Sequence, residues 1–187
     1  MDLDTTAEAL LVVDVQRAFV VGPSAVASAD TVTSAIGRLL AAARAAGAVV
    51  IHLQNDGDPG STDEPGTDGW KLFYTPAAGE LVIRKRDDDG FVGTELESAL
   101  FDNRVATMVL CGIQSEMCVA ATARGAMRRG LSIMLPRDAH STYPIPADDG
   151  GVAVSAAQVS RVAEWSLGDQ AVAPATASDV AFARGAQ

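Results

Sequence analysis

Short apolar runs alternate with helix-like stretches along most of this chain, and that alternation limits the possible folds more than any other feature. The apolar runs predict six buried strands, at residues 9–14, 48–53, 81–84, 105–111, 131–135 and 171–173. The stretches between them predict helices, at residues 30–46, 94–101, 115–129 and 155–167. Fully apolar strands that alternate with helices are typical of a parallel sheet covered on both faces. We therefore expect a three-layer α/β fold.

A chain of 187 residues is long enough for one domain with a substantial core, so residues 1–187 are expected to form a single domain. The one long irregular stretch covers residues 54–79 and is rich in Gly, Asp, Pro and Thr. A loop of that length inside a compact domain is usually functional or disordered. Its conformation therefore influences the shape of any neighbouring pocket.

The formal net charge of −10 narrows the choice of partners. Nucleic acid and anionic lipid both bind clustered Lys and Arg, so neither nucleic acid nor membrane is an expected partner. The acidic balance is compatible with a cationic substrate, although such a balance more often simply keeps a protein in solution. Two cysteines, Cys111 and Cys118, do not make a disulfide framework and indicate a reducing, cytoplasmic setting.

Three polar residues fall at the ends of predicted elements. Asp14 ends the first strand, Lys85 follows the third, and Cys118 lies in the first turn of the helix after the fourth. In an open parallel sheet, ligands bind outside the carboxyl ends of the strands, where the strand order reverses. We expect Asp14 and Cys118 to meet at that point, with Lys85 on the same edge.

These residue types suit nucleophilic catalysis. A thiol has a pKa of about 8.5, and a helix N-terminus or a nearby ammonium group such as that of Lys85 lowers it. Asp14 can take the thiol proton of Cys118 and return it to a leaving amine. Each residue also has an ordinary structural interpretation, since buried cysteines often only pack, an Asp can cap a turn, and a Lys is usually solvated. Spacing alone leaves both interpretations open.

Four motifs follow one another along the chain. They are Leu-Val-Val-Asp-Val-Gln at residues 11–16, Ile-Arg-Lys at 83–85 with Gly-Phe-Val-Gly-Thr-Glu-Leu at 90–96, Cys-Gly-Ile-Gln-Ser-Glu-Met-Cys-Val at 111–119 with Ala-Thr-Ala at 121–123, and Asp-Ala at 138–139. In this order and spacing they closely resemble the motifs of the isochorismatase-like cysteine hydrolases. No single motif is specific, but four in family order are.

The resemblance implies a Rossmann-like fold with a six-stranded, mostly parallel sheet and a catalytic triad of Asp14, Lys85 and Cys118. It also implies a non-proline cis peptide between Ile113 and Gln114. The backbone N–H groups of Gln114 and Cys118 would then form an oxyanion hole. A homo-oligomer, a dimer or a tetramer, is expected on the same grounds.

Further residues are candidates for binding a small-molecule substrate because they lie near the triad in sequence or in the long loop. They are Gln16, Phe19, Trp70, Phe91, Glu116 and Tyr143. Two of them have an equally good structural interpretation: Trp70 can pin the loop to the body, and Glu116 can favour the helix dipole. Cys111 ends an apolar run and is expected to be buried and inert.

No cofactor or metal is expected. The chain has no Gly-rich phosphate-binding motif. The resemblance extends to nicotinamidases, which bind a metal through an Asp-x-His pair and further histidines, but that cluster is missing around His52. His52 is expected to be a structural residue at a strand end, and His140 a loop residue near the mouth of the site.

The resemblance implies hydrolysis of a C–N bond in a small amide or lactam through an acyl-enzyme. The pattern is similar to that of streptothricin hydrolases, which open a lactam in a cationic antibiotic, and N-carbamoyl amidases such as N-carbamoylsarcosine amidase are near neighbours. The alternative is vinyl-ether hydrolysis of isochorismate, which needs an acid and not a nucleophile, so Cys118 argues against it. A non-enzymatic binding module is the third hypothesis, since fold alone does not determine function.

Overall fold

The computed structural model describes residues 6–184, so residues 1–5 and 185–187 of the predicted domain lie outside the described part. A seven-stranded sheet forms its centre, and every neighbouring pair in it is parallel. The strand order is β4–β3–β2–β5–β6–β8, and β7 also pairs with β5. Their bounds are β2 Ala9–Val13, β3 Val49–Asn55, β4 Leu81–Lys85, β5 Thr107–Ile113, β6 Ser132–Met134, β7 His140–Ser141 and β8 Ala171–Val172. The predicted α/β fold with a parallel sheet is confirmed.

The seventh strand, β7, is an addition to the six predicted. It has two residues and pairs with the last two of β5, whereas β6 pairs with Thr107–Val109 at the other end of β5. The chain therefore leaves the sheet after β6 and returns to it as β7, which pairs with the carboxyl end of β5. So short a strand has no apolar run of its own, and for this reason the sequence pattern does not reveal it.

The sheet has its switch point at β2. This strand lies between β3 and β5, and the chain builds β3 and β4 on one side before it crosses to β5 on the other. Residues that directly follow β2 and β5 therefore come out next to each other at one edge, as expected for a ligand site in this class of fold.

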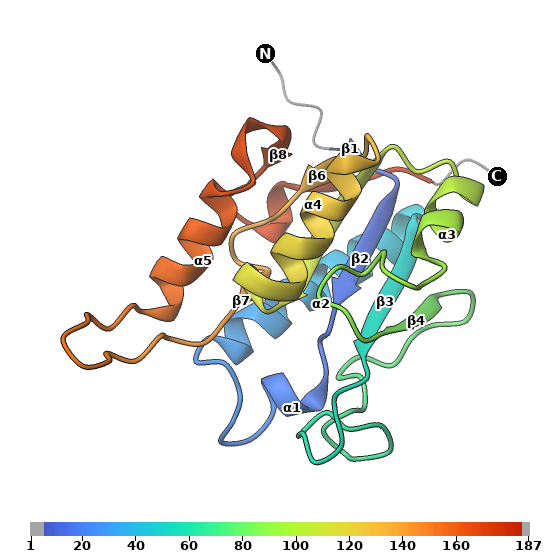
Figure 1. Cartoon of the computed structure of the whole chain (residues 1–187). Coiled ribbons are helices and arrows are strands. Elements are labelled where there is room, and N and C mark those ends of the chain that lie inside the picture. The colour runs from blue at the N-terminus through green and yellow to red at the C-terminus, as the bar shows by residue number, and fades with distance from the viewer. Residues whose placement is uncertain (1–5, 185–187) are drawn as a thin grey trace.

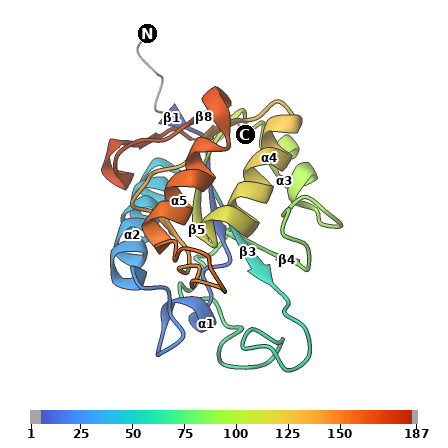
Figure 2. The ribbon, with the colours of Figure 1, turned by 60° about the vertical axis from the view of Figure 1, so that its left-hand side comes forward.

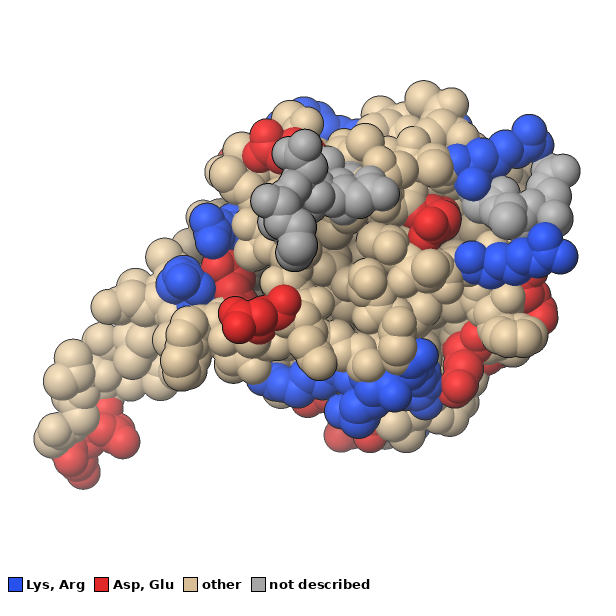
Figure 3. Space-filling model, turned by 90° about the horizontal axis from the view of Figure 1, so that it is seen from above, with Lys and Arg blue, Asp and Glu red and all other residues tan. Residues whose placement is uncertain are grey.

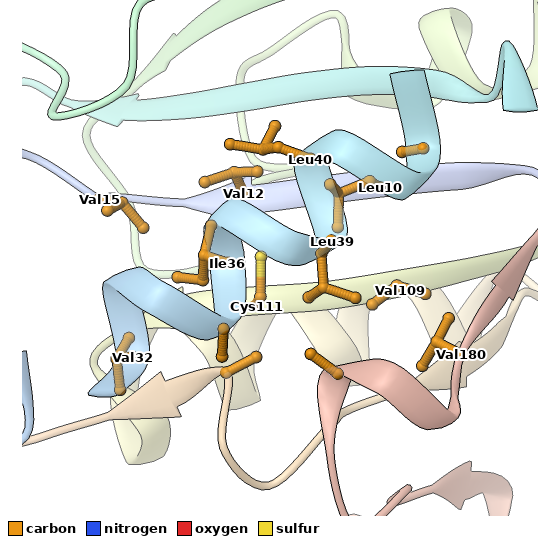
Figure 4. Packing of buried hydrophobic residues seen from close by; sticks show 14 of the residues in the cluster. Leu10, Val12, Val15, Val32, Ile36, Leu39, Leu40, Val109, Cys111 and Val180 are labelled. Atoms are coloured by element: carbon orange, nitrogen blue, oxygen red, sulfur yellow. The ribbon is translucent and has the colours of Figure 1, made fainter. Parts of the chain in front are cut away.

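Alternate residues of the central strands face opposite layers. On β2, Leu10 and Val12 pack against helix α2 (Ala29–Ala46), in the cluster that Figure 4 shows around Ile36 and Leu39. Leu11 and Val13 face the other way, into a second buried cluster with residues of α3 and α4. The two clusters account for the fully apolar character of the strands, because both faces are covered.

Helices form the two outer layers (Figures 1 and 2). Helix α2 covers one face and ends at Gly47, whose φ of 71° is the left-handed conformation that favours glycine. The other face carries α3 and α4, while α5 packs beside β7 and the segment before α4. The remaining helical bounds are α1 Arg17–Val20, α3 Leu96–Asp102, α4 Ala120–Arg128, α5 Ala156–Trp165, η2 Gly168–Gln170 and η3 Ala177–Asp179.

The single helix predicted at residues 115–129 is wrong in its first turn. The structure has a π-helical turn, η1 (Ser115–Val119), and α4 begins only at Ala120. The Gln114 carbonyl accepts hydrogen bonds from the N–H groups of Met117 and Val119, at 3.2 Å and 3.1 Å, so the turn is one residue wider than an α-helical turn. Met117 has a non-helical φ of −102° and ψ of −107°. The kink therefore falls directly before Cys118.

Two short strands, β1 (Thr6–Ala7) and β9 (Ala181–Phe182), pair in parallel and bring the two ends of the described chain together. Figure 3 shows this end of the molecule, where acidic and basic side chains are interspersed around the rim. Within residues 6–184, no helix is both long enough and apolar enough to cross a membrane.

Candidate active site

The structure brings Asp14, Lys85 and Cys118 together at the carboxyl edge of the sheet. Asp14 directly follows β2 and has a φ of 50°, which is uncommon for a residue other than glycine. Lys85 is the last residue of β4, and Cys118 lies in η1 after β5. The predicted grouping follows from the strand order, since all three elements end at the same edge.

The Lys85 ammonium group connects the other two side chains. Its Nζ lies 2.7 Å from Asp14 Oδ2 and donates to Cys118 Sγ at 3.3 Å and to the Asp87 carbonyl at 3.2 Å. A lysine has three N–H donors, and three acceptor atoms surround this one, although its contact with Asp14 is an ion pair and not a well-aligned hydrogen bond. The ammonium is thereby held in one position between the carboxylate and the sulfur.

The three side chains differ in exposure. Asp14 and Lys85 are 2% and 3% exposed, whereas Cys118 is only partly buried. Within the described part of the chain, neither carboxylate oxygen of Asp14 accepts a well-aligned hydrogen bond, although Oδ2 forms the close ion pair with Lys85. Asp14 therefore keeps lone pairs that can accept a proton, and the sulfur is the member of the triad that a ligand can reach.

Burial and charge set the protonation of the triad. Burial raises the pKa of the Asp14 carboxyl group, and the Lys85 charge opposes this only in part. Burial lowers the pKa of Lys85, but the charges of Asp14 and Cys118 outweigh it and raise that pKa overall. Burial also raises the pKa of the Cys118 thiol, the Asp14 carboxylate adds to the effect, and Lys85 opposes it. The resting site therefore holds a charged Lys85 and a protonated Cys118.

The prediction of a lowered thiol pKa is therefore wrong for the resting protein. It considered the helix N-terminus and Lys85, but not burial or the carboxylates around the sulfur. One of these is Asp88, which the sequence analysis missed: Cys118 Sγ donates to Asp88 Oδ1 at 3.4 Å. The available signal was the run of three aspartates that begins two residues after Lys85.

Gly112 allows η1 to lie close to Asp14. Its φ is 127°, and a Cβ atom built there would lie 2.0 Å from the Val13 carbonyl oxygen. A side chain at this position would therefore push β5 away from β2. One residue further on, the peptide bond between Ile113 and Gln114 is cis, as the resemblance implies. The oxyanion hole from the N–H groups of Gln114 and Cys118 stays a prediction.

Gln16 has a different role from the predicted one of substrate binding. It is fully buried, and its Nε2 donates to the carbonyls of Asn55 and Trp70, both at 3.0 Å. Its Oε1 accepts from the Asn55 N–H at 2.8 Å. This side chain therefore clamps together the two ends of a long loop, and its amide is not available to a substrate.

Phe91 lies in the core beside α3 and α4. Its side chain is 6% exposed, packs in the second core cluster with Leu96 and Leu100, and lies 4.3 Å from the guanidinium carbon of Arg129. It therefore belongs to the layer of α3 and α4, and a role in substrate binding stays a prediction. A motif identifies the residue, but the direction of its side chain depends on the path of the following turn.

Trp70 follows the structural interpretation. Its Nε1 donates to Asp56 Oδ1 at 2.9 Å, and the guanidinium carbon of Arg84 lies 5.1 Å from its ring centroid. Arg84 in turn forms an ion pair with Asp56 at 2.7 Å. These contacts attach the loop to the end of β4.

The three other predicted binding residues lie as follows. Phe19 packs half-buried against the α2 cluster, and the Tyr143 hydroxyl donates to the Ser24 carbonyl at 2.7 Å. Glu116 is exposed in η1, and its Oε1 accepts from Thr142 at 2.8 Å. A role of these residues in substrate binding stays a prediction.

The two histidines are both buried in the sheet. His52 has its Nε2 at 3.0 Å from Glu80, as expected for a structural residue, but it lies in the middle of β3 and not at a strand end. His140 is not a loop residue at the mouth of the site: it lies in β7, 3% exposed, with Nδ1 at 2.8 Å from Ser115 Oγ. Among residues 6–184, no three His, Cys, Asp or Glu side chains are grouped as a metal site requires.

The fold and this site define a hydrolase of the isochorismatase class. Residues 8–166 match the isochorismatase domain, and the chain belongs to that family. It is 53% identical over 179 residues, and 51% over 178 residues, to two streptothricin hydrolases of Streptomyces noursei. These alignments cover 94% of this chain but 71% and 64% of the two relatives, which are longer. A crystal structure of an isochorismatase from Pseudomonas putida KT2440 superposes with a TM-score of 0.85, at 28% identity, over 92% of this chain and 90% of that one.

Proposed function

We propose that the protein hydrolyses a C–N bond of a small amide or lactam through a thioester on Cys118. The observation that carries this proposal is the Lys85 ammonium group, 2.7 Å from Asp14 and 3.3 Å from Cys118 Sγ. It joins a proton acceptor to a nucleophile that ligands can reach. An acyl transfer needs both, within hydrogen-bond reach of each other.

In the first step, Cys118 Sγ attacks the substrate carbonyl while Asp14 takes the thiol proton. Because the thiol is protonated at rest, proton transfer accompanies the attack and does not precede it. The Lys85 charge stabilises the negative charge as it forms on the sulfur. The ion pair with Asp14 and the hydrogen bond to the Asp87 carbonyl hold the ammonium in place, so little reorganisation is needed at that moment.

The tetrahedral intermediate carries a negative oxygen. The backbone N–H groups of Gln114 and Cys118 are the proposed donors to it. The kink at Met117 supports this, since it interrupts the regular helical turn directly before Cys118. Losing one such donor typically costs about 100-fold or more in rate.

Collapse of the intermediate breaks the C–N bond, and Asp14 returns its proton to the leaving nitrogen. In a lactam that nitrogen stays attached to the acyl group, whereas in an open amide it leaves as a separate amine. Water then attacks the thioester, Asp14 accepts its proton, and Cys118 recovers the thiol. The net reaction adds one water across the C–N bond.

For the substrate, we propose the lactam of a streptothricin-type antibiotic. Two relatives more than 50% identical bear the name streptothricin hydrolase. The net charge of −10 suits a cationic substrate. An N-carbamoyl amide and isochorismate are the other substrates to be compared with it.

The test measures turnover of a panel that contains streptothricin, simple lactams, N-carbamoyl amides and isochorismate. We expect a product 18 Da heavier than the lactam, and no turnover by Cys118→Ala or Cys118→Ser. Cys111→Ala is the matched control, because Cys111 is fully buried on β5 and lies outside the triad. Mass spectrometry of the enzyme after it is mixed with substrate should show an acyl adduct on the peptide that contains Cys118. Retained turnover by Cys118→Ala would exclude covalent catalysis, and turnover of isochorismate alone would favour the vinyl-ether reaction.

The cytoplasmic location and a dimeric or tetrameric assembly remain predictions. The two thiols are both free, in agreement with a reducing compartment. Light scattering coupled to size-exclusion chromatography measures the assembly directly.

A further inference from the structure

Asp88 occupies an unusual position beside the nucleophile. Its Oδ1 accepts from Cys118 Sγ at 3.4 Å, and the residue is exposed. Asp14, the carboxylate of the triad, lies on the buried side of the site. The sulfur therefore lies between a carboxylate in the interior and a carboxylate that solvent and substrate can reach.

The backbone holds Asp88 in place. Its carbonyl accepts from Thr122 Oγ1 at 3.2 Å, and the same hydroxyl accepts from the Gly90 N–H at 2.9 Å. Thr122 is fully buried in α4, so this turn is fixed to the helix that follows the nucleophile. The Asp88 carboxylate thus reaches the sulfur from a rigid part of the structure.

The two neighbouring aspartates serve the turn itself. Asp87 Oδ1 accepts from the Asp89 N–H at 2.9 Å, and Asp89 accepts from the Phe91 N–H at 3.1 Å and pairs with Arg128 at 2.9 Å. Of the three carboxylates, that of Asp88 therefore makes its contact with the reacting sulfur. It is the member whose charge acts on the reaction.

A carboxylate at this distance opposes the reaction of a neutral substrate. Negative charge that develops on the sulfur is repelled by Asp88, and the thiol hydrogen bond to Oδ1 must be given up when the proton goes to Asp14. A cationic group beside Asp88 removes both obstacles. It neutralises the carboxylate and takes over Oδ1 as its own hydrogen-bond acceptor.

We propose that Asp88 is a specificity-determining residue that binds a cationic group of the substrate, an ammonium or a guanidinium, and thereby releases Cys118 for attack. This inference rests on the proposed function and adds to it the residue that selects a cationic substrate. No proton goes to Asp88: the thiol proton still moves to Asp14, and the hydrogen bond to Oδ1 passes from S–H to the N–H of the substrate.

Thiol reagents of different charge test the proposal without any knowledge of the substrate. Methanethiosulfonates with an aminoethyl, a methyl and a sulfonatoethyl group are cationic, neutral and anionic, and each gives a mixed disulfide with Cys118 and methanesulfinate. Rates are measured by mass spectrometry on the peptide that contains Cys118, relative to 2-mercaptoethanol at low salt. The ratio of the cationic to the anionic rate is independent of how much thiolate is present, because the same Cys118 thiolate attacks every reagent.

We expect Asp88→Asn to lower that ratio about tenfold, since one unit charge near the sulfur acts in opposite directions on the two reagents. The neutral reagent should react faster with Asp88→Asn than with the wild type at the same pH. Asp87→Asn is the matched control, because it removes an equal charge one residue away and leaves the backbone carbonyl that Lys85 contacts. Its ratio should stay within about twofold of the wild type.

An unchanged ratio in Asp88→Asn, or an equal fall in Asp87→Asn, would overturn the proposal. Labelling requires no turnover, so this result is independent of whether the protein hydrolyses amides. If Cys118→Ala retained turnover while the charge ratio behaved as expected, the covalent mechanism would fail and the cation preference of the site would stand. If the ratio failed while the amide panel succeeded, only the role of Asp88 would be lost.

Discussion

Two networks of polar side chains meet at the π-helical turn η1, and the buried carboxylate of each has a different number of ionic partners. One is the triad of Asp14, Lys85 and Cys118. The other starts from Ser115, three residues before the nucleophile, and runs through His140 to Glu164 on α5. Both contain a carboxylate that is almost completely buried, with side-chain exposures of 3% for Asp14 and 6% for Glu164.

The difference lies in the number of partners. The Glu164 carboxylate has three basic neighbours: Arg137 at 3.2 Å, His140 at 3.4 Å and Arg161 at 3.5 Å. Burial raises the pKa of the Glu164 carboxyl group, but the hydrogen bond and charge of His140, with those of Arg137, outweigh burial and lower it overall.

Among residues 6–184, Asp14 forms an ion pair with one cation, Lys85, and its pKa is raised. Burial alone therefore does not mark a functional carboxylate. A buried carboxylate with few ionic partners, beside an accessible nucleophile, is a better marker of a functional site.

The largest effect is expected from Lys85→Met. It leaves the Asp14 carboxylate buried without a counter-ion, which lowers the free energy of unfolding at pH 7 by about 3–5 kcal/mol. Urea unfolding measures this loss. The double variant Asp14→Asn/Lys85→Met should regain most of it, because no charge then remains buried. A double variant as unstable as Lys85→Met would show that the loss comes from packing and not from charge.

The same variant has a pH signature. In Lys85→Met the pKa of Asp14 in the folded state lies further above its unfolded value, which is about 3.8. A raised pKa penalises folding above the folded-state pKa, and the penalty disappears as the pH falls to the unfolded value. The stability gap to the wild type should therefore close on acidification.

The next effect concerns the two thiols. Iodoacetamide should label Cys118 on the order of 100-fold faster than Cys111 in the folded protein, because Cys111 is fully buried in β5 and reacts only through opening of the core. Peptide mapping measures the two rates. Since the Cys118 pKa is raised above 9.0, its labelling should still be rising at pH 9. A plateau near neutral pH would contradict the resting thiol. In urea the two rates should become equal.

Glu164→Gln should act on stability and hardly on activity. Losing a charged acceptor costs about 2 kcal/mol in the free energy of unfolding at pH 7. Because the Glu164 pKa is lowered in the folded state, its contribution is present above the unfolded value of 4.5 and is lost as the pH falls through the folded value. The gap to the wild type again closes on acidification. Here, however, the wild type loses stability, whereas in Lys85→Met the variant recovers. Urea unfolding at pH 7 and pH 3.5 separates the two cases.

The smallest effect is expected from Ser160→Ala. Ser160 lies on α5 and shares a hydrogen bond of 3.0 Å with Ser115. Removing its hydroxyl should cost about 0.5–1 kcal/mol, and turnover should change less than about twofold. Thermal unfolding and the amide assay measure the two quantities. A large loss of turnover would mean that this second network of side chains takes part in the reaction and would end the distinction between the two regions.

Much of the architecture was predictable because it follows from continuous patterns. Apolar runs predicted the strands, and the order of a doubly wound sheet brought Asp14 next to the helix after β5. Lys85 joined them because parallel strands end at one edge. These inferences need only the element to which a residue belongs.

What escaped prediction depends on single contacts. The split of the helix at Ala120 results from two hydrogen bonds to the Gln114 carbonyl, and such π-turns have no periodic signal. Asp88 lies beside the sulfur because Thr122 fixes its backbone, while Phe91, three residues on, turns into the core. A single sequence says which residues are close along the chain, but not which way each side chain points.

Gln16 has a consequence for how proteins of this design change. Its amide ties Asn55 to Trp70, so the residues between them form a closed excursion whose two ends are held by one side chain. Because one side chain holds both ends, we expect replacement, shortening or extension of that segment to leave the triad and the sheet in place. The segment can therefore be exchanged between proteins of this fold, and a new substrate preference can arise while the sheet and the triad stay the same.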